Sequence, residues 1–380
     1  MKIFLCPDSF KGTMSSEKIC DIVTKAIKSV EKDADIVAAP VADGGEGTVD
    51  TFLYALGGNK VFLSVKGPLG NEVSSFYGIL KDGKTAIVEM AAASGLPLAE
   101  NNKNPLITST YGTGQLIYDA IINKGCTDLI IGIGGSATND AGIGAATALG
   151  AVITDKSGYQ LEPIGRSLNF IDKIDLSRID SKIFKTNITV ACDVTNPLYG
   201  PNGAAYVYGP QKGADKEAIG LLDNGLRNFA SVVKKDLNIE VDQIPGGGAA
   251  GGLGAGLFAF FNANLKRGID IVLDIIDFNR IVKDIDLIIT GEGRIDSQSL
   301  YGKVPYGVAI RAKKHGVPVV VIAGDIDGDM SALYKTGITS VFTTNRKAMA
   351  FKDLQKNAEQ YLYDTAVDVI RLFMFSQSLL

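Results

Sequence analysis

Several short stretches of this sequence combine glycines with side chains that bind phosphate groups or metal ions. In PDSFKGT, Asp8, Ser9 and Lys11 directly follow a short apolar run. A lysine beside the start of a helix suits a phosphate or a carboxylate, whereas a capped turn with a solvated lysine needs no ligand. For this stretch taken alone, both interpretations stay open.

The stretch PVADGGEGT places Asp43 and Glu46 on either side of two glycines. Two acids this close repel each other unless a cation lies between them, and Mg²⁺ is commonly held by one or two carboxylates together with substrate phosphates. The alternative is an Asp-Gly turn before a helix with an acid in its first turn. The pattern favours a metal site at Asp43 and Glu46.

The stretch LIIGIGGSATNDAGIG contains a G-x-G-x-x-A pattern at Gly132, Gly134 and Ala137. Together with Asp155, at the distance of a ribose-binding acid, it is typical of a dinucleotide-binding loop. A nicotinamide-dependent oxidoreductase is therefore one alternative, although such a pattern on its own is a weak signal.

Polar residues follow these glycines at once, which suits a phosphoryl group and its metal better than a nicotinamide. We interpret the loop as phosphate-binding and give Asp155 no role. The phosphate-binding candidates are Gly134, Gly135, Ser136, Thr138 and Asn139. A helix that begins near Ala141 would point its N-terminus at the same anion.

Three later stretches extend this set. CDVTNPLYGPNGA places Asp193 at a strand end, and YGPQKGA adds Lys212 among glycines. The loop PGGGAAGGLGAG, with Gly247 and Gly248, is either a phosphate cradle or a place where close helix packing demands small residues. These two interpretations weigh about equally.

The stretch TGEGRIDSQSLYGK is the densest in charged and amide groups. An arginine there suits bidentate capture of a carboxylate. The sequence has neither a P-loop nor a protein-kinase signature. The candidates in this stretch are Glu292, Arg294, Asp296, Gln298 and Lys303.

The composition narrows the chemistry. The only histidine, His315, follows a basic helical stretch, so a Ser-His-Asp hydrolase or a histidine-ligated metal site is not expected. The four cysteines are far apart, which argues against a structural zinc site or a disulfide framework. Acid–base work then falls to carboxylates or lysines, and this combination fits phosphoryl transfer.

The elements that must position these residues follow two patterns. A strand, a polar loop and a helix occur twice at the start of the chain and again near its end, which is typical of a parallel sheet covered by helices. Residues 60–97 alternate like antiparallel hairpins. We therefore expect a doubly wound α/β domain built from residues 1–59 and 282–380, with a mixed α/β domain, residues 60–281, inserted in it.

The loops of a doubly wound sheet meet at the carboxyl ends of its strands, where ligands bind. DSFKG, ADGGEG and GEGRID all follow expected strands, so they should converge on one edge. Further helices are expected near residues 115–124, 141–149, 216–235 and 354–375.

The net charge of −4 argues against a surface for nucleic acids or anionic membranes. The apolar run before Pro7 is too short for a signal peptide, and no stretch is long and apolar enough to span a bilayer. We expect a cytoplasmic protein with small-molecule substrates, and a solute-binding protein without enzymatic activity is a second alternative. The oligomeric state stays open, a homodimer included.

The motifs quoted above occur together and in the same order in the bacterial glycerate kinase family (type I), which this chain resembles over nearly its whole length. The resemblance implies a flavodoxin-like domain with an inserted mixed domain. It also implies the reaction of ATP with D-glycerate to give ADP and a phosphoglycerate, usually taken as 2-phosphoglycerate.

On this basis we expect the nucleotide phosphates and Mg²⁺ in the cleft between the domains, near the loops Gly134–Asn139 and Pro245–Gly252. Asp193 or Asp296 would take the hydroxyl proton, and Arg294 or Lys11 would hold the glycerate carboxylate. The expected set comprises Asp193, Asp296 and Lys11 as catalytic, Asp8, Ser9, Arg294, Gln298 and Lys303 as substrate-binding, and Asp43, Glu46 and Glu292 as metal-binding residues.

Overall fold

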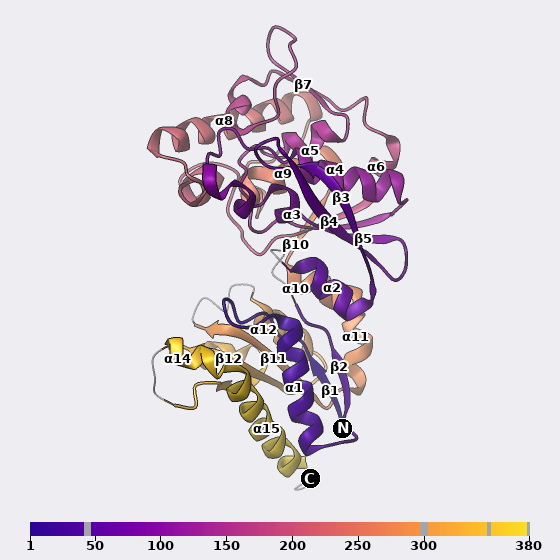
Figure 1. Ribbon diagram of the computed structural model, residues 1–380, viewed down its shortest axis with the longest axis vertical. Helices are drawn as coiled ribbons and strands as arrows, with labels where there is room; N and C mark the ends of the chain where they lie inside the picture. Colours follow the sequence, from indigo (N-terminus) through magenta and orange to yellow (C-terminus); the bar gives the residue numbers. More distant parts are fainter. Residues whose placement is uncertain (42–46, 297–302, 348–350, 378–380) are drawn as a thin grey trace. The chain divides into compact units, whose positions relative to one another are not determined.

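The computed structural model describes residues 1–41, 47–296, 303–347 and 351–377. Three predicted site residues, Asp43, Glu46 and Gln298, lie outside the described residues. The chain divides into two compact units (Figure 1). The first unit comprises Met1–Ala42, Tyr54–Leu56 and Ile269–Leu380, and the second unit comprises Asp43–Leu53 and Gly57–Gly268.

The first unit is built on a five-stranded sheet in which every neighbouring pair of strands is parallel. Its strands are β1 (Lys2–Leu5), β2 (Asp35–Ala38), β11 (Leu287–Ile295), β12 (Val319–Ile326) and β13 (Ile338–Thr343). The spatial order is β13-β12-β11-β1-β2. Counted within the unit this is the flavodoxin order, whose switch point lies between β1 and β11. The predicted doubly wound α/β class is thus confirmed.

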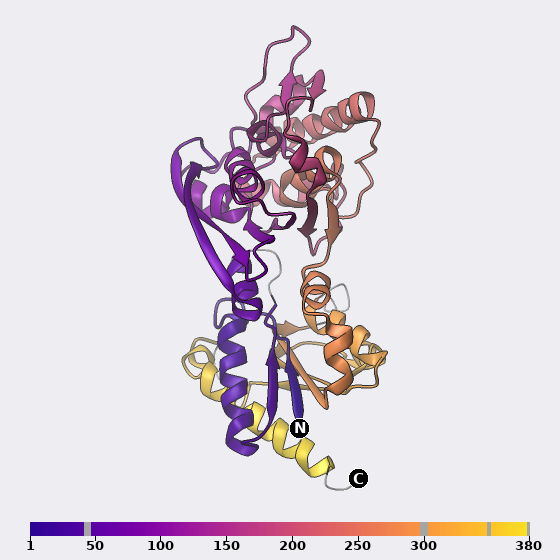
Figure 2. The ribbon, with the colours of Figure 1, turned by 90° about the vertical axis from the view of Figure 1, so that its right-hand side faces the viewer.

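Helices cover both faces of this sheet (Figure 2). They are α1 (Ser16–Val30), α10 (Gly268–Ile275), α11 (Phe278–Ile281), α12 (Val304–Lys313), α13 (Ser331–Lys335), α14 (Phe351–Lys356) and α15 (Ala358–Gln377), with a 3₁₀ turn at Val282–Asp284. On one face α1 packs with α15 over Ile3 and Leu5. Because side chains alternate along a strand, Phe4 points to the other face, where its ring meets that of Phe278 edge-on.

The amphipathic pattern of α1 explains why this helix forms. Ile19, Val23, Ala26 and Ile27 recur at three- and four-residue spacing and are all buried. The hydroxyl of Ser15 accepts a hydrogen bond from the N–H of Lys18 and caps the helix. At the other end of the unit, the single helix expected at residues 354–375 is divided into α14 and α15.

The second unit contains a mixed six-stranded sheet in the order β10-β9-β6-β5-β4-β3. Its strands are β3 (Gly58–Lys66), β4 (Glu72–Leu80), β5 (Thr85–Glu89), β6 (Asp128–Gly132), β9 (Asn187–Ala191) and β10 (Asn264–Lys266). Pairing is antiparallel from β3 to β5, as the hairpin pattern predicts, and parallel from β5 to β10. A small antiparallel pair joins β7 (Val152–Thr154) to β8 (Lys173–Asp175).

Helices and turns surround this sheet, and α2 belongs partly to each unit. They are α2 (Thr48–Leu56), α3 (Ala91–Ser94), α4 (Tyr111–Tyr118), α5 (Ile143–Ala148), α6 (Ser181–Lys185), α7 (Ala204–Tyr208), α8 (Lys216–Leu237) and α9 (Ala249–Phe261), with 3₁₀ turns at Leu96–Asn102, Gly165–Phe170 and Pro210–Lys212 and a π turn at Asp119–Asn123. The helix expected from residue 115 begins four residues earlier, as α4.

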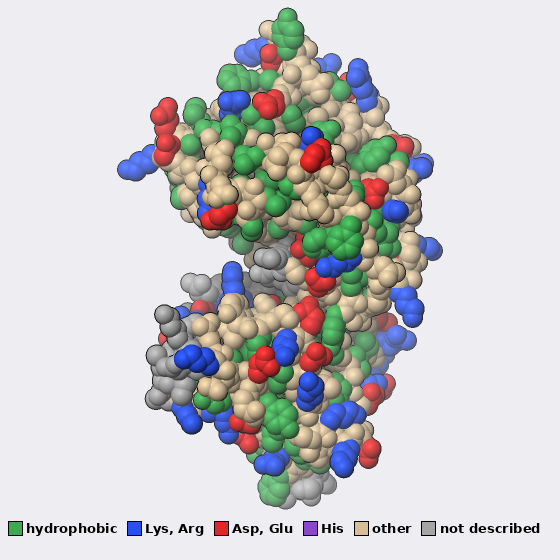
Figure 3. All heavy atoms as spheres, viewed as in Figure 1, with side chains coloured by type: hydrophobic (Ala, Val, Ile, Leu, Met, Phe, Trp, Pro, Cys, Tyr) green, Lys and Arg blue, Asp and Glu red, His purple; other side chains and the backbone are tan. Residues whose placement is uncertain are grey.

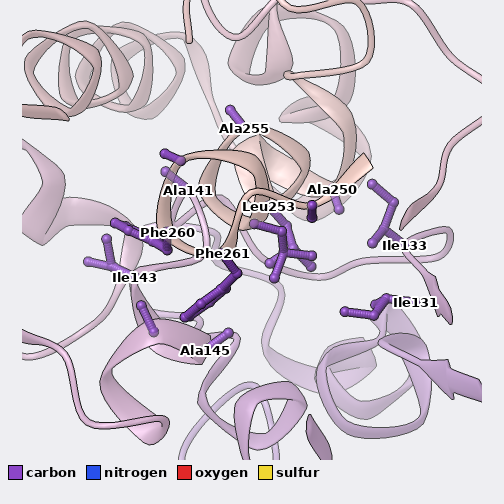
Figure 4. Close-up of a cluster of buried hydrophobic side chains, with 14 of the residues drawn as sticks. Ile131, Ile133, Ala141, Ile143, Ala145, Ala250, Leu253, Ala255, Phe260 and Phe261 are labelled. Atoms are coloured by element: carbon purple, nitrogen blue, oxygen red, sulfur yellow. The ribbon is translucent and has the colours of Figure 1, made fainter. Parts of the chain in front are cut away.

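Helix α9 begins within the glycine-rich stretch, but Ala250, Gly251 and Gly252 have left-handed backbone angles, so the regular helix continues only from Leu253. It forms part of the buried core of the second unit (Figure 4). A Cβ atom on Gly251 would lie 2.1 Å from the carbonyl oxygen of Thr138, and one on Gly256 would lie 2.1 Å from that of Ala141. The N–H of Ala141 donates to the carbonyl of Gly251 at 3.0 Å. These glycines therefore serve close backbone packing.

The surface in Figure 3 mixes basic and acidic side chains on both units. No helix among the described residues is long and apolar enough to cross a membrane.

Candidate functional site

The glycine loop of the second unit, residues 134–140, begins just beyond the buried strand β6. Strands β5 and β9 run parallel to β6 on its two sides. The loop is held at two points: the N–H of Ala137 donates to the carbonyl of Ser94 at 2.9 Å, and the N–H of Leu96 donates to that of Gly135 at 2.8 Å. Gly135 is exposed and has a φ of +71°, a conformation that favours glycine.

Lys212, predicted to contact phosphate, lies against this loop and is only 2% exposed. Its Nζ donates to Ser136 Oγ and to the carbonyl oxygen of Thr138, both at 2.7 Å. Burial lowers the pKa of Lys212 to about 7, and the negative charge of Asp140 partly opposes that shift. The lysine is thus a buried amine that is held by neutral oxygen atoms and gives up its proton more easily than an exposed lysine.

Asp140 fixes the far end of the loop from a fully buried position. Its carboxylate accepts hydrogen bonds from the N–H and the hydroxyl of Thr110 at 2.7 and 2.8 Å. It also accepts from the N–H groups of Gly142 and Gly144, both at 3.2 Å. Burial raises the pKa of Asp140, and the four hydrogen bonds oppose that rise. The carboxylate joins the residue before α4 to the first turn of α5.

Two side chains of the loop have unused hydrogen-bonding capacity. The hydroxyl of Thr138 and both amide atoms of Asn139 are buried and have no partner among the described residues. Buried polar groups in folded proteins are nearly always paired, so unpaired ones indicate a ligand, an ion or a catalytic role. The hydrogen bonds of Lys212 also bring four predicted phosphate-binding residues together, namely Ser136, Thr138, the adjacent Asn139 and Lys212 itself.

The two predicted glycines of the second loop are placed differently. The N–H of Gly247 donates to the carbonyl of Ile244 at 2.8 Å, and the N–H of Gly248 donates to that of Asn196 at 3.0 Å. A Cβ on Gly248 would lie 2.2 Å from the carbonyl oxygen of Pro197. Both N–H groups are thus used within the chain, which leaves neither of them to bind a phosphate.

Asp193 is exposed and follows the end of β9. Its Oδ1 accepts a hydrogen bond from the N–H of Gly268, the first residue of α10, at 3.0 Å. The neighbouring Cys192 is buried, and burial raises the pKa of its thiol to about 11, which keeps it protonated and unreactive at neutral pH.

In the first unit, the structure brings the candidates after β1 and β11 together. The N–H of Asp8 donates to the carbonyl of Gly291 at 2.8 Å, and the N–H of Ser9 donates to Asp8 Oδ1 at 2.6 Å. A Cβ on Gly293 would lie 3.3 Å from the backbone nitrogen of Lys11. These loops lie at the switch point of the sheet, where ligands of such folds bind.

Lys303 and Glu292 form an ion pair beside these loops. Lys303 Nζ lies 2.6 Å from Glu292 Oε1 and 3.7 Å from Asp296 Oδ1. The side chain of Glu292 is only 8% exposed, whereas that of Asp296 is 27% exposed. Glu292, predicted to bind metal, is thus ion-paired to Lys303 through Oε1.

Arg294 is ion-paired to two acids that the sequence analysis did not single out. Its guanidinium contacts Asp327, and its Nε lies 4.0 Å from Asp325 Oδ2. Both acids follow or end β12, and the register of β11 on β12 sets Asp325 opposite Arg294. The sequence did carry a signal for them, because both lie at the end of a strand, and the other candidate acids were selected by that same position.

The sequence analysis also missed Glu89, a nearly fully buried acid at the end of β5. Its Oε1 accepts a hydrogen bond from the N–H of Val49 in the first turn of α2 at 2.6 Å. The register of β5 on β6 places Glu89 beside Gly132. Burial raises the pKa of Glu89, and hydrogen bonds from the start of α2 oppose that rise. The signal that could have identified it is its position as an acid within the apolar run of β5 and the residues that follow.

Among the described residues, no group of three His, Cys, Asp or Glu side chains is arranged to hold a metal ion. Apart from Asp193, Glu89 and the glycines of the second loop, the described candidates thus form one group in each unit: the loop 134–140 with Lys212 in the second, and the ends of β1, β11 and β12 in the first.

Comparisons with known proteins agree with one another. The sequence profile of the glycerate kinase family matches residues 3–374. The chain is 48% identical over 370 residues to a glycerate kinase of Bacillus subtilis, with 97% of each chain covered. It is 49% identical over 344 residues to a glycerate 2-kinase of Escherichia coli, with 90% of each covered.

A solved structure gives the same result. A crystal structure from Salmonella typhimurium LT2, assigned as a glycerate kinase 2, superposes with a TM-score of 0.89 at 43% identity. The match covers 100% of this chain and 99% of that one.

Proposed function

Because the chain belongs to the glycerate kinase family, we propose that it transfers the γ-phosphoryl group of ATP to D-glycerate. The products are ADP and a phosphoglycerate, with the 2-hydroxyl as the acceptor. Phosphoryl transfer needs positioning and charge stabilisation more than it needs a strong nucleophile. A chain with one histidine and buried cysteines is suited to that task.

One observation carries the nucleotide part of this proposal: the buried ammonium of Lys212 lies behind a loop with unpaired polar groups. Thr138 and Asn139 supply an unpaired hydroxyl and an unpaired amide, and Gly135 is exposed beside them. A buried cation and unpaired hydrogen-bonding groups suit the oxygen atoms of a phosphate chain. We assign the nucleotide phosphates to this loop.

The glycerate part rests on the cluster at the switch point of the first unit. Arg294, Lys303 and Lys11 supply the positive charge for a carboxylate, and Asp8 and Ser9 lie in the adjoining loop. Asp296 or Asp193 is the proton acceptor for the reacting hydroxyl. Removing that proton in the transition state is the one acid–base step the reaction requires.

Mg²⁺ accompanies the nucleotide in this proposal. It would supply charge neutralisation for the phosphate oxygens, with Asp43 and Glu46 as its carboxylate ligands. Glu292 is a weaker candidate because its oxygen already binds the ammonium of Lys303 at 2.6 Å.

The direct test is a coupled assay for ADP release from ATP and Mg²⁺ on addition of D-glycerate. NMR spectroscopy of the product distinguishes 2-phosphoglycerate from 3-phosphoglycerate. ADP release that depends on D-glycerate supports the proposal. Thermal stabilisation by NAD(P) alone, without ADP release, would favour an oxidoreductase. Stabilisation by glycerate without turnover would favour a binding protein.

A further inference from the structure

Lys212 has a buried position that the phosphate-binding role proposed for its loop does not by itself explain. The residue ends the turn Pro210–Lys212 and is followed by Gly213 at a φ of +93°. A Cβ on Gly213 would lie 2.3 Å from the carbonyl oxygen of Lys103, so the backbone there is packed closely. The start of the side chain is therefore fixed.

The ammonium at the other end is fixed as well. Two of its three N–H donors are used, on Ser136 Oγ and on the Thr138 carbonyl, and the residue is only 2% exposed. The third donor belongs to the same buried nitrogen, so a ligand would have to enter the interior of the protein to reach it. Asp140 acts on the lysine only through its charge, because its own oxygens are occupied by Thr110, Gly142 and Gly144.

The loop itself presents the free donors. The N–H groups of Gly134, Gly135 and Ser136 donate to no oxygen among the described residues. Gly134 is half-buried and Gly135 is exposed, so their backbone is open to a ligand. Thr138 and Asn139 carry the unpaired side-chain groups described above. Consecutive free N–H groups in such a turn form an anion-binding concavity.

We propose that Lys212 is a positioning residue, which acts on the bound phosphate through the glycine loop and does not contact the phosphate. It holds Ser136 and the Thr138 carbonyl so that the free N–H groups of the loop stay in place. This inference rests on the proposed function, because it takes the loop as the nucleotide site.

The test is a double-mutant cycle with Lys212→Met, Ser136→Ala and the combined variant, each assayed with ATP and D-glycerate. We expect Lys212→Met to lower kcat/KM for ATP about 10- to 100-fold, because groups that bind a charged ligand are displaced. Ser136→Ala should lower it about 3- to 10-fold in the same way. The combined variant should be within about twofold of Lys212→Met, because both changes release the same loop.

Comparing the effects on the two substrates separates this role from a general loosening of the fold. KM for D-glycerate should stay within about twofold of the wild type in all three variants. Hydrogen exchange should increase in residues 134–140 of Lys212→Met and stay unchanged in α8. Lys216→Met is the matched control, since Lys216 is exposed four residues away, and it should behave like the wild type.

Three results would overturn the inference. The first is additive losses in the combined variant, which indicate that Lys212 contacts the phosphate independently. The second is an equal rise in KM for both substrates. The third is an unchanged kcat/KM for ATP in Ser136→Ala, and this result decides the matter if Lys212→Met does not fold. A wild-type chain that releases no ADP with D-glycerate would instead refute the proposed function.

Discussion

The two units hold the basic side chains of their candidate sites in opposite ways. In the second unit, the ammonium of Lys212 is buried and bound by a hydroxyl and a carbonyl oxygen, which are neutral. In the first unit, Lys303 and Arg294 are more exposed and bound by the carboxylates of Glu292 and Asp327. Neutral oxygen atoms do not cancel the positive charge that Lys212 has when it is protonated. A carboxylate cancels that charge until the ligand competes for the cation.

The difference follows from the local environment. The Arg294–Asp327 pair is exposed on both sides, so water screens it and a substrate carboxylate can replace the acid at low cost. In the Lys303 pair the acid, Glu292, is only 8% exposed. A buried charge is costly to expose or to leave without hydrogen bonds, so it is held rigidly. We therefore expect stability to depend on the second unit's cluster and glycerate affinity to depend on the first unit's cluster.

The largest expected effect is on stability, from Asp140→Ala in the second unit. The change leaves the N–H groups of Thr110, Gly142 and Gly144 without their acceptor in a buried place. We expect a loss of about 3 kcal/mol or more in the free energy of unfolding, measured by urea denaturation. Asp155→Ala is the control, because that acid accepts from a turn at the surface, and it should lose much less. An equal loss of unfolding free energy in the two variants would contradict the view that the buried cluster of the second unit contributes most to stability.

The next effect is on glycerate binding, from Arg294→Ala in the first unit. If the guanidinium binds the glycerate carboxylate, KM for D-glycerate should rise about 10- to 100-fold, while KM for ATP changes little. Arg346→Ala removes another exposed arginine that is ion-paired to an acid, Asp368, and serves as the control. Steady-state kinetics with each substrate varied checks the prediction. A rise in KM for ATP alone would contradict the prediction, because it would indicate that Arg294 acts on the nucleotide and not on glycerate.

A smaller effect concerns pH. The folded-state pKa of Lys212 is lowered to about 7 from 10.5, so between these values the unfolded chain binds the proton that the folded chain has lost. Stability rises with pH wherever the unfolded state binds more protons. The unfolding free energy of the wild type minus that of Lys212→Met should therefore increase from pH 7 to pH 10. Urea denaturation at pH 6.5, 8 and 9.5 measures it, and a constant difference would mean that the lysine stays charged.

The smallest expected effect is that of Asp327→Asn on stability. The ion pair with Arg294 is exposed on both sides, so the melting temperature should match that of the wild type. KM for D-glycerate should fall slightly, because Arg294 loses its competing carboxylate. A clear drop in melting temperature would show that the acid has a structural role, and the contrast between the units would be weaker.

Much of the fold could be predicted from local patterns. Alternation identified the hairpins of β3 and β4, and three- and four-residue spacing identified α1. For the stretch 245–256 the sequence left a phosphate cradle and close helix packing both open, because it could not show that Gly251 and Gly256 pack on the backbone of Thr138 and Ala141. That packing partner is more than a hundred residues away and leaves no local signal.

The candidate site shows the same division. Glycines and polar residues at strand ends predicted the loops, because parallel strands place such loops at one edge of a sheet. The sequence could not show that Lys212 bonds to Ser136, 76 residues away, or that Asp327 pairs with Arg294. It also could not show that the N–H groups of Gly247 and Gly248 are used by nearby carbonyls. Such contacts depend on tertiary packing.

The order of the strands in the first unit also determines when that unit can form during synthesis. Strand β1 pairs with β11, and the hydroxyl of Thr290 bonds to the carbonyl of Cys6 across 284 residues. The ribosome must therefore release most of the chain before β1 gains this neighbour, while the sheet from β3 to β10 is complete earlier. Domains generally fold as units as they emerge. The second unit can thus be folded before β1 gains β11 as its neighbour, so the first unit is completed last.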